Sequence, residues 1–360
     1  MSDTSIRIVQ PGPLTLVQDA GRSGFQRLGV SVSGAADMDS LLIGNRLVGN
    51  SSNAAGLEAM LGALSLEFTA ESVFALTGAD TQARLDGVLL GTNVSYVAHG
   101  GSILELGMAT DGLRSYVSIA GGIEAQETLG SRSTHVASEV GGIEGRALKQ
   151  EDVLAIGAAS DTAVSGVTHV KPPVSNHAEL EVRVILGPQD VLFSDSGIST
   201  FLESQYTITD QSNRQGLRLD GPVVESKSGS YDIISDAVVN GSVQIPGDGK
   251  PIVLLADRQT TGGYAKIATV ASVDLPLLGQ ATPGTKLSFK AISVAEAQSL
   301  YAEKRELIAN SPLEEVIVSE QFAVNDSQYQ VGVAQNGSAK LVTLDGIAYP
   351  VSFEEITPAN

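Results

Sequence analysis

Short runs in which apolar and polar residues alternate recur along the chain, separated by Gly and Pro. The alternation is clearest in four runs: Leu64, Leu66 and Phe68; Leu104 and Leu106; Val117 and Ile119; Leu180, Val182 and Val184. A period of two residues predicts strands with one buried face. Three segments, residues 100–107, 149–157 and 283–292, each begin with a turn signal, continue as such a strand and loosely echo one another. The pattern predicts an all-β sandwich or barrel with related hairpins in both halves.

The stretch that organises the rest is residues 253–270, VLLADRQTTGGYAKIATV. An apolar run over residues 252–256 ends at Asp257, and the apolar pattern resumes at Ile267. Between them stand Arg258, Gln259, Thr260, Thr261, Gly262, Gly263 and Lys266. This pattern predicts a buried strand, a polar loop hinged on two glycines, and a second strand. Paired glycines let a backbone approach a ligand closely or adopt a positive φ, so the loop suits a reactive site. A polar hairpin turn without a ligand explains the same residues equally well.

Two segments have helical periodicity. The first follows Asp37, a suitable N-cap, and Gly49 is placed to end it. Its apolar face carries Met38, Leu41, Leu42, Asn45 and Val48. Asn45 must find hydrogen-bond partners on that face, either in a neighbouring loop or in a bound substrate. The second predicted helix, residues 294–309, is rich in Ala, Glu, Lys and Leu, which favours a surface position.

The domain boundaries follow from composition. Residues 158–175 are small and polar and end in Pro172 and Pro173, as expected of an interdomain linker. We therefore expect an N-terminal β domain over residues 1–165 and a second β domain over residues 176–310. Residues 311–360, with an Asn336-Gly337 turn signal, predict a small appended β extension.

Composition restricts the partners. A chain of 360 residues is long enough for two domains, and with 4% aromatic residues and no Trp its core must consist of Val, Leu, Ile and Ala. The 22 Lys plus Arg against 41 Asp plus Glu give a net charge of −19. Because this charge repels phosphate backbones and anionic lipids, nucleic acid and membrane surfaces are poor partners. An ordinary acidic soluble protein accounts for the charge without a special role.

The sequence also excludes several kinds of chemistry. With no Cys there is no disulfide, thiolate nucleophile or Cys-ligated metal. The N-terminus shows no signal-peptide pattern and no apolar run is long enough to cross a bilayer, so we expect a cytoplasmic protein. The segment GDGKP at 247–251 lacks the other residues of a Walker A loop, and no serine sits in a GxSxG elbow. The four His lack metal-ligand spacing, and no Met-Lys pair of a biotin carrier is present.

Three polar segments remain as candidates for binding. Residues 17–39 place Asp19, Arg22 and Asp37 among several glycines, and Arg22 offers a bidentate fork to carboxylate or phosphate. An ion pair between Asp19 and Arg22 that only fixes the loop is the alternative. Residues 129–135 supply donors for an oxyanion or phosphate nest: Ser131, Arg132, Ser133 and Thr134. Arg214 stands close to Gly216 in a third polar loop.

Five blocks in the right order resemble the biotin-dependent carboxyltransferase family. They are VQDAGRSGFQRLGVSVSGAADMD, NRLVGNSSNAAGLEAML, TLGSRSTH with GGIEGRALKQEDVL, SNRQGLRLDGP, and GSVQIPGDGKPIVLLADRQTTGGYAKIA. The family includes allophanate hydrolase subunit 2, KipA, the matching region of urea carboxylase and the C subunit of 5-oxoprolinase. The resemblance spans about residues 8–294. It implies a mainly β fold of two cyclophilin-like β-barrel domains with a few short helices.

The resemblance also implies a function shared between several proteins. The expected activity is a hydrolase reaction, the ATP-dependent opening of 5-oxoproline to L-glutamate, performed with two partners: a LamB/YcsF-type A subunit, plus a KipI-like B subunit. Phosphorylation of the lactam oxygen creates a leaving group and needs cationic donors, for which Arg22, Arg132, Arg214 and Lys266 are suitable. Asp257 is expected to hold Mg²⁺ with the nucleotide or to accept a proton. The expected substrate or nucleotide contacts are Gln259, Thr260, Thr261, Gly262, Gly263, Ser131, Ser133, Asp37, Asn45 and Arg214.

Two other functions fit the same resemblance. One is carboxyl transfer from carboxybiotin, supplied by a separate carrier protein, to a urea or amide nitrogen. The other is a non-catalytic KipA-type regulator that binds a KipI-like partner. The chain departs from the family pattern at Ser31, Gln215 and Ala265, which stand where Pro, Met and Pro are common. These changes remove no charged group, so they bear on the substrate more than on the fold.

Overall fold

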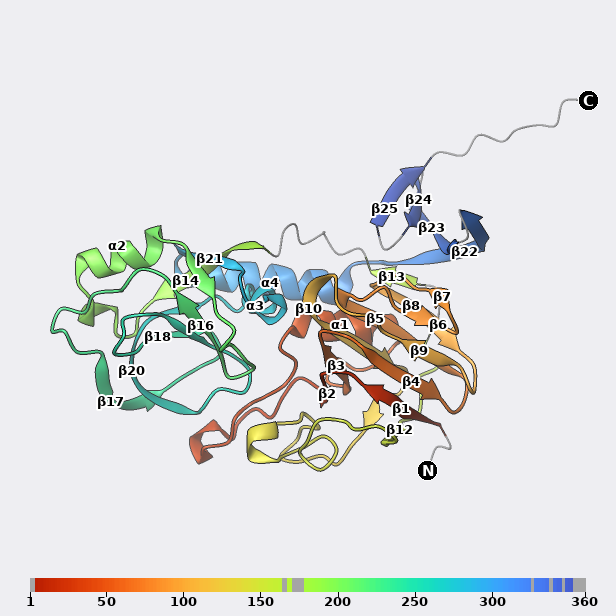
Figure 1. Cartoon of the computed structure of the whole chain (residues 1–360), viewed down its shortest axis with the longest axis horizontal. Coiled ribbons are helices and arrows are strands. Elements are labelled where there is room, and N and C mark those ends of the chain that lie inside the picture. Colours follow the sequence, from red (N-terminus) through yellow and green to blue (C-terminus); the bar gives the residue numbers. More distant parts are fainter. Residues whose placement is uncertain are drawn as a thin grey trace, which may run out of the picture.

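Two antiparallel sheets enclose the core of the N-terminal lobe, on the right in Figure 1. The computed structural model describes residues 4–163, 167–169, 178–324, 327–336, 339–344 and 347–351. The strand order of the first sheet is β11 (Ile123–Glu124), β12 (Val153–Ile156), β1 (Ser5–Pro11), β4 (Leu64–Phe68), β9 (Ile103–Glu105), β6 (Arg84–Leu85) and β7 (Val88–Leu89). The second begins β2 (Leu14–Gln18), β3 (Gly56–Met60), β10 (Asp111–Ile119), β5 (Ser72–Asp80), β8 (Val94–Ala98) and β13 (Val167–His169).

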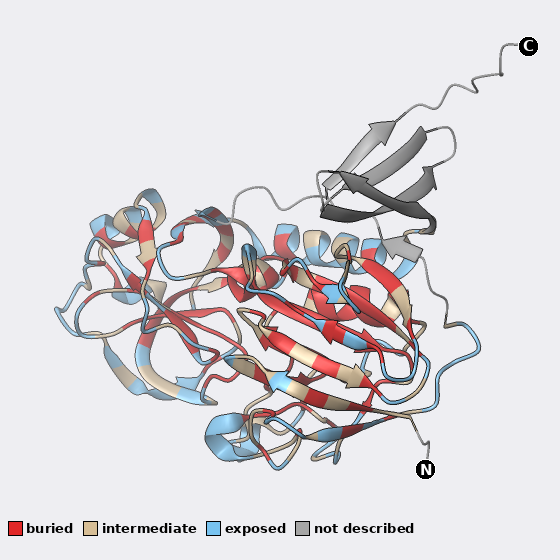
Figure 2. Ribbon diagram, turned by 45° about the vertical axis from the view of Figure 1, so that its right-hand side comes forward, coloured by how far each residue is buried: buried red, intermediate tan, exposed pale blue. Residues whose placement is uncertain are grey.

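The predicted alternation explains this core. In the β1–β4 ladder Ile6 pairs with Phe68 and Ile8 with Leu66, and all four side chains are fully buried. Their strands turn the intervening polar residues outward, as a period of two requires. Buried residues concentrate along the strands of both lobes in Figure 2. The strand predictions at Leu104, Val117 and Val182 are likewise confirmed.

The C-terminal lobe is a closed barrel. Its strand order is β14 (Glu179–Leu186), β21 (Lys286–Ala291), β15 (Tyr206–Ile208), β16 (Gly216–Asp220), β19 (Ile252–Leu254), β18 (Ser242–Ile245) and β20 (Thr261–Val270). A β14–β20 pairing closes the ring, and β17 (Asp232–Ala237) adds to the outer side of β20. A second core of Val, Leu, Ile and Phe fills the barrel. The mainly β fold is therefore confirmed.

The two predicted helices are present. Helix α1 (Met38–Leu47) is capped by Asp37, whose carboxylate accepts from the Ser40 amide at 3.0 Å. Gly49 follows with φ +70°, the left-handed geometry that ends a helix. Helix α4 (Val294–Asn310) is mostly exposed, and Ser293 is its N-cap. The sequence did not predict α2 (Asp195–Glu203), α3 (Leu275–Gln280) or the 3-10 turns η1 (Gln26–Leu28), η2 (Val136–Ser138) and η3 (Asp190–Leu192).

Helix α4 ties the lobes together. It runs along both of them in Figure 1. Its Lys304 Nζ contacts the Asp39 carboxylate of α1 in one lobe and donates to the Val273 carbonyl of the other at 2.7 Å. In addition, Arg46 of α1 donates to the Ile308 carbonyl at 2.7 Å. These contacts fix the angle between the lobes without crossing the candidate site.

The predicted β extension is also observed. Strands β22 (Leu313–Val324), β23 (Ser327–Asn336), β24 (Ala339–Leu344) and β25 (Ile347–Val351) form an antiparallel meander. β22 pairs with β13, so the meander continues the second N-terminal sheet. Gly337 of the predicted turn lies outside the described residues. Half of the predicted linker 158–175 does too, and the domain boundaries stay a prediction. No helix in the described part of the chain is both long and apolar enough to cross a bilayer.

One expectation about the organising stretch was wrong. Gly262 and Gly263 do not form a loop; they lie inside β20, opposite β17. Neither has a positive φ. A Cβ on Gly262 would lie 2.3 Å from the Gln244 side-chain nitrogen, so a larger residue there would have to displace the end of that side chain. The polar loop is therefore shorter than predicted and ends at Thr260.

Gly279 offers a test of how closely the lobes pack. A Cβ on this α3 residue would lie 2.4 Å from the Ala36 carbonyl oxygen and 3.0 Å from the Asp37 amide. Because both obstacles are backbone, Gly279→Ala should lower the free energy of unfolding by about 1–3 kcal/mol in urea denaturation. Gly247 is the matched control, since a Cβ there would have no neighbour within 4 Å, and Gly247→Ala should change stability by less than about 0.5 kcal/mol. Equal stability of the two variants would contradict the close contact.

Candidate functional site

A buried Arg214 guanidinium links the two lobes. Arg214, which precedes β16, donates from Nε to Asp257 Oδ2 at 2.7 Å and from Nη2 to Asp257 Oδ1 at 3.1 Å. Its Nη1 contacts Glu58 of β3 in the other lobe, and its Nη2 also donates to the Gly34 carbonyl at 2.6 Å. Burial works against the charge, but the Glu58 and Asp257 carboxylates outweigh it and keep the pKa of Arg214 above its usual value. The loop around Asp257 is thus held by a permanent cation.

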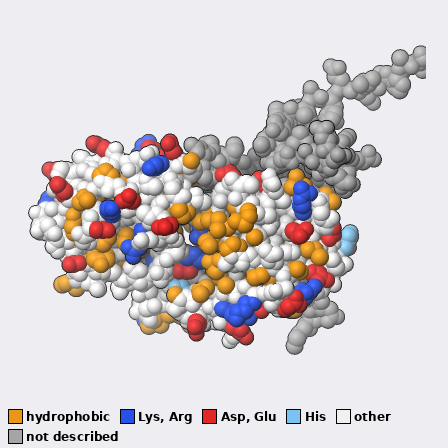
Figure 3. All heavy atoms as spheres, viewed as in Figure 1, with side chains coloured by type: hydrophobic (Ala, Val, Ile, Leu, Met, Phe, Trp, Pro, Cys, Tyr) orange, Lys and Arg blue, Asp and Glu red, His pale blue; other side chains and the backbone are white. Residues whose placement is uncertain are grey.

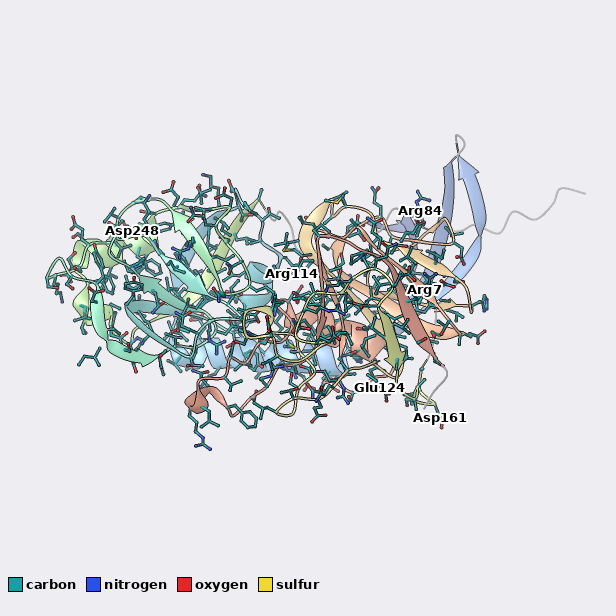
Figure 4. The ribbon with its side chains drawn as sticks, turned by 60° about the horizontal axis from the view of Figure 1, so that its bottom comes forward. Arg7, Arg84, Arg114, Glu124, Asp161 and Asp248 are labelled. Atoms are coloured by element: carbon teal, nitrogen blue, oxygen red, sulfur yellow. The ribbon has the colours of Figure 1, made fainter. Side chains whose placement is uncertain are left out.

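Glu58 continues the network into the N-terminal lobe. Its Oε2 accepts from the Tyr116 hydroxyl at 2.8 Å and from the Ala36 amide at 2.9 Å. Burial, with help from the Glu58 and Asp37 carboxylates, raises the pKa of Tyr116 far above its usual value, so this phenol remains a donor. Arg114 Nε lies 3.4 Å from Glu58 Oε1. Figure 4 places Arg114 where the two lobes meet.

Helix α3 closes the network from the C-terminal lobe. Gln280 donates to Asp37 Oδ2 at 2.7 Å and accepts from the Leu113 and Arg114 amides at 2.9 Å each. Asp37 therefore caps α1 and secures α3, which accounts for its carboxylate without a substrate. The sequence analysis missed Glu58 and Gln280. Glu58 had a signal, a carboxylate inside the apolar run of residues 56–60, whereas Gln280 had none.

Asp257 is also contacted from the N-terminal lobe. The Ser33 hydroxyl lies 2.7 Å from Asp257 Oδ1 and 3.1 Å from the Thr134 carbonyl oxygen. His135 Nε2 lies 3.4 Å from the Asp257 carbonyl, and its Nδ1 accepts from the Ser138 amide. The three polar segments predicted around Arg22, Ser133 and Arg214 thus converge on the Asp257 turn. Since Arg214 and Ser33 already engage both carboxylate oxygens, Asp257 does not fit the role of a Mg²⁺ ligand.

The predicted phosphate nest is filled by the chain itself. The fully buried Asp19 accepts from the hydroxyls of Ser131 at 2.7 Å and Ser133 at 2.5 Å, and from the Arg132 amide at 2.6 Å. An internal carboxylate therefore occupies the donors that were expected to hold an oxyanion. The alternative, an Asp19–Arg22 ion pair, was also wrong, because Arg22 Nη2 donates to the Ser133 carbonyl instead.

The side chains of three other predicted site residues make their contacts away from the Asp257 carboxylate. The Arg132 side chain faces the surface, 3.4 Å from Glu127. Lys266 Nζ donates to Asp236 Oδ2 at 2.8 Å, a bond that lowers the pKa of Asp236. Asn45 donates to the Ala54 carbonyl at 2.8 Å, so its partners lie in a neighbouring loop. Their catalytic or binding roles stay predictions.

The rest of the turn is accessible. Gln259 and Thr261 are exposed and Thr260 is half-buried, so these side chains can reach a bound molecule. Two turns close in sequence to site residues carry exposed apolar side chains: Leu28 on η1 is 62% exposed and Val136 on η2 is 42% exposed. Both turns project from the lower edge of the molecule in Figure 1. Figure 3 shows a further group of hydrophobic side chains near the middle of the face it displays.

Two further features of the described residues bear on where a ligand could bind. A hollow of about 230 Å³ lies elsewhere, where β5 begins and β12 ends. No group of three or more His, Asp or Glu side chains in the described part is arranged to hold a metal ion.

The fold and this junction define a carboxyltransferase-type protein of two subdomains. The chain belongs to that family, since residues 28–291 match the family model described as "Carboxyltransferase domain, subdomain A and B". It is 38% identical to the 5-oxoprolinase C subunit of Escherichia coli (strain K12) over 292 residues, which cover 81% of this chain and 93% of that protein. The family resemblance predicted from the sequence is confirmed.

Larger proteins contain a similar region. Urea amidolyase of Saccharomyces cerevisiae is 32% identical over 317 residues, 82% of this chain but 17% of that protein. Among solved structures, the Kluyveromyces lactis urea carboxylase superposes with a TM-score of 0.81 and 29% identity, covering 94% of this chain and 33% of that one. The fold is therefore shared with segments of much longer enzymes.

Glu58→Gln tests the network across the lobes. It removes one of the two charges that compensate the buried Arg214, so urea unfolding should show a loss of about 3 kcal/mol. Glu67→Gln is the control, because Glu67 pairs with the partly exposed Arg7 and should cost less than about 1 kcal/mol. If both variants lost the same free energy of unfolding, the buried Glu58–Arg214 contact would stabilise the protein no more than the Glu67–Arg7 pair does.

Proposed function

We propose that this chain is the C subunit of an ATP-dependent 5-oxoprolinase, a hydrolase that opens 5-oxoproline to L-glutamate together with its A and B subunits. The observation that carries the proposal is the 38% identity to a 5-oxoprolinase C subunit over 93% of the length of that protein. The urea amidolyase match covers 17% of its relative, so that enzyme contains much that this chain lacks.

The junction favours an orienting role in this reaction. A lactam amide is a poor electrophile, and activation of its oxygen develops negative charge that cationic donors stabilise. Arg214 and Ser33 hold the Asp257 turn, which presents Gln259, Thr260 and Thr261 to a substrate. Arg22 is the candidate cation on the other side of the turn. ATP supplies the phosphoryl group in the proposed reaction, and no residue of this chain is assigned to the nucleotide.

A heteromeric complex accounts for the exposed apolar turns. Leu28 on η1 and Val136 on η2 expose large fractions of their surface at segments that lead into the site. Exposed large apolar side chains on projecting loops are typical of surfaces that a second protein covers. The partners we propose are the KipI-like B subunit, together with the LamB/YcsF-type A subunit.

A second candidate is the carboxyltransferase component of a biotin-dependent urea or amide carboxylase. The urea amidolyase and urea carboxylase similarities favour it. Carboxybiotin would then come from a separate carrier protein. The same turn would orient the accepting nitrogen, so the two candidates differ in substrate and partner more than in the residues used.

Reconstitution separates the candidates. The chain is co-expressed with a LamB/YcsF-type protein and a KipI-like protein, and ATP-dependent release of glutamate from 5-oxoproline is measured. In parallel, ATP-dependent urea carboxylation is assayed with a biotin carboxylase and a biotinylated carrier. Glutamate release that requires this chain supports the first candidate. Urea carboxylation without glutamate release would overturn it in favour of the second.

Asp257→Asn tests the turn. Asn keeps the size of the side chain but weakens the charge-assisted bonds to Arg214, so the turnover number for 5-oxoproline should fall about 100-fold or more in the complex. Asp248→Asn is the control, because Asp248 lies in an exposed loop of the barrel lobe (Figure 4). Thermal unfolding of both variants checks that the fold survives. Wild-type turnover in Asp257→Asn would remove Asp257 from the site.

Arg132→Ala tests the least buried of the four predicted cationic residues. Its side chain is at the surface beside Glu127, so the variant should fold normally. We expect it to abolish ATP-dependent 5-oxoproline cleavage if the guanidinium contacts the substrate in the complex. Normal cleavage would leave Arg132 with only the backbone role that its amide plays at Asp19.

A further inference from the structure

Two arginines near the Asp257 turn are buried without a counter-ion. Arg22 is 1% exposed and Arg258 is 6% exposed. The other buried arginines of the junction, Arg114 and Arg214, lie beside the Glu58 carboxylate. Within the described part of the chain, neither Arg22 nor Arg258 has a carboxylate at ion-pair distance. A buried guanidinium in that state retains the cost of leaving water without the usual compensation.

Their hydrogen bonds also leave donors free. Arg22 Nη2 donates to the Ser133 carbonyl, and its Nε has no partner in the described structure. Arg258 Nη1 lies 3.5 Å from the Leu255 carbonyl and Nη2 lies 3.2 Å from Gln26 Oε1, while its Nε is also without a partner. Each side chain therefore keeps a buried, unsatisfied N–H on a charged group. Such groups are uncommon in folded proteins and need an explanation.

Arg258 is part of the Asp257 turn itself, and Arg22 lies on a different segment that packs against this turn. The segment that carries Arg22 packs on the turn through the Ser33 amide, which donates to the Ala256 carbonyl at 3.1 Å. Gln26 of the same segment contacts Arg258 and also donates to the Val238 carbonyl at 2.7 Å. Burial lowers the pKa of both Arg22 and Arg258; the charges of Asp19 and then Asp257 oppose this for Arg22, and the charge of Asp257 opposes it for Arg258. Both guanidinium groups thus lie within electrostatic range of Asp257.

Asp257 does not neutralise either of them directly. Its two oxygens accept from Arg214 at 2.7 and 3.1 Å, and Ser33 occupies a further position on Oδ1. Asp19, the other nearby carboxylate, is saturated by hydroxyl and amide donors. Within the described residues neither carboxylate forms an ion pair with Arg22 or Arg258, so the unpartnered Nε groups of these two arginines are left for a group that the chain does not itself provide.

We propose that Arg22 and Arg258 bind the carboxylate of a small anionic substrate at the Asp257 turn. A carboxylate is planar, and guanidinium N–H groups match its two oxygens. The inference deepens the proposed function and rests on it for the identity of the substrate. 5-Oxoproline carries a carboxylate beside its lactam ring, whereas urea is neutral. The pair of arginines would thus select the first and orient its lactam toward Gln259, Thr260 and Thr261.

Binding to the full chain, alone and in the reconstituted complex, tests the proposal by calorimetry. The probes are 5-oxoproline and 2-pyrrolidinone, which has the same lactam ring without the carboxylate. At constant ionic strength 5-oxoproline should bind at least about tenfold more tightly. Arg22→Gln and Arg258→Gln should each remove most of that preference. Equal affinity for the two lactams, or no binding of 5-oxoproline in either form of the protein, would overturn the carboxylate site.

Arg84→Gln is the matched control. Arg84 is exposed, donates to the Gly87 carbonyl at 2.9 Å and lies away from the junction in Figure 4. It should bind 5-oxoproline like the wild type. Arg22→Lys retains the charge and should recover part of the affinity, which a purely structural role would not predict. If Arg22→Gln fails to fold, Arg258→Gln gives the answer, since a wild-type preference in that variant contradicts the proposal.

Turnover in the complex separates this inference from the proposed function. Arg258→Gln should raise KM for 5-oxoproline at least about tenfold and change kcat less. Wild-type cleavage with unchanged KM in both arginine variants would sink the inference and leave the function standing. If the wild-type complex did not cleave 5-oxoproline but the chain still bound it through Arg22 and Arg258, the function would fail and the anion site would remain.

Discussion

The structure depends on one guanidinium that serves two carboxylates from opposite lobes. Arg214 meets Asp257 within its own lobe and Glu58 in the other, and all three are buried. A charge taken out of water must be compensated where it lies, so moving the lobes apart would leave Arg214 with Asp257 alone and Glu58 with Arg114 alone. The loops that carry Ser33, His135 and Asp257 are aligned as a result. The candidate site therefore lies where the two lobes are joined.

The regular parts of the fold were open to prediction because their causes are local. Alternation at Leu64, Leu66 and Phe68 needs only a strand with one buried face, and Asp37 and Gly49 mark the ends of α1 through backbone geometry. Helix α3 was not predictable in the same way. It is short, and what stabilises it is the contact of Gly279 and Gln280 with the other lobe.

The candidate site was predicted in part for a related reason. Residue types and glycines identified which loops carry polar groups, and these loops do converge on Asp257. Sequence could not say which donors the chain satisfies by itself. Ser131, Ser133 and the Arg132 amide resembled an empty anion nest, and only the position of Asp19 shows that they are filled. Arg258 was not singled out from the sequence, because only the structure shows that its buried Nε has no hydrogen-bond partner among the described residues.

The arrangement of Glu58 and Arg214 also bears on how the chain folds during translation and on how recombination can exchange its two halves. As the ribosome releases the chain, the first lobe emerges with Glu58 and Arg114 but without Arg214, the cation that joins it to the second lobe. The contact between the lobes can form only after the second half has been made. A recombination event that exchanged one half alone would have to preserve the contact between Glu58 and Arg214. The family model accordingly runs across both subdomains as one unit.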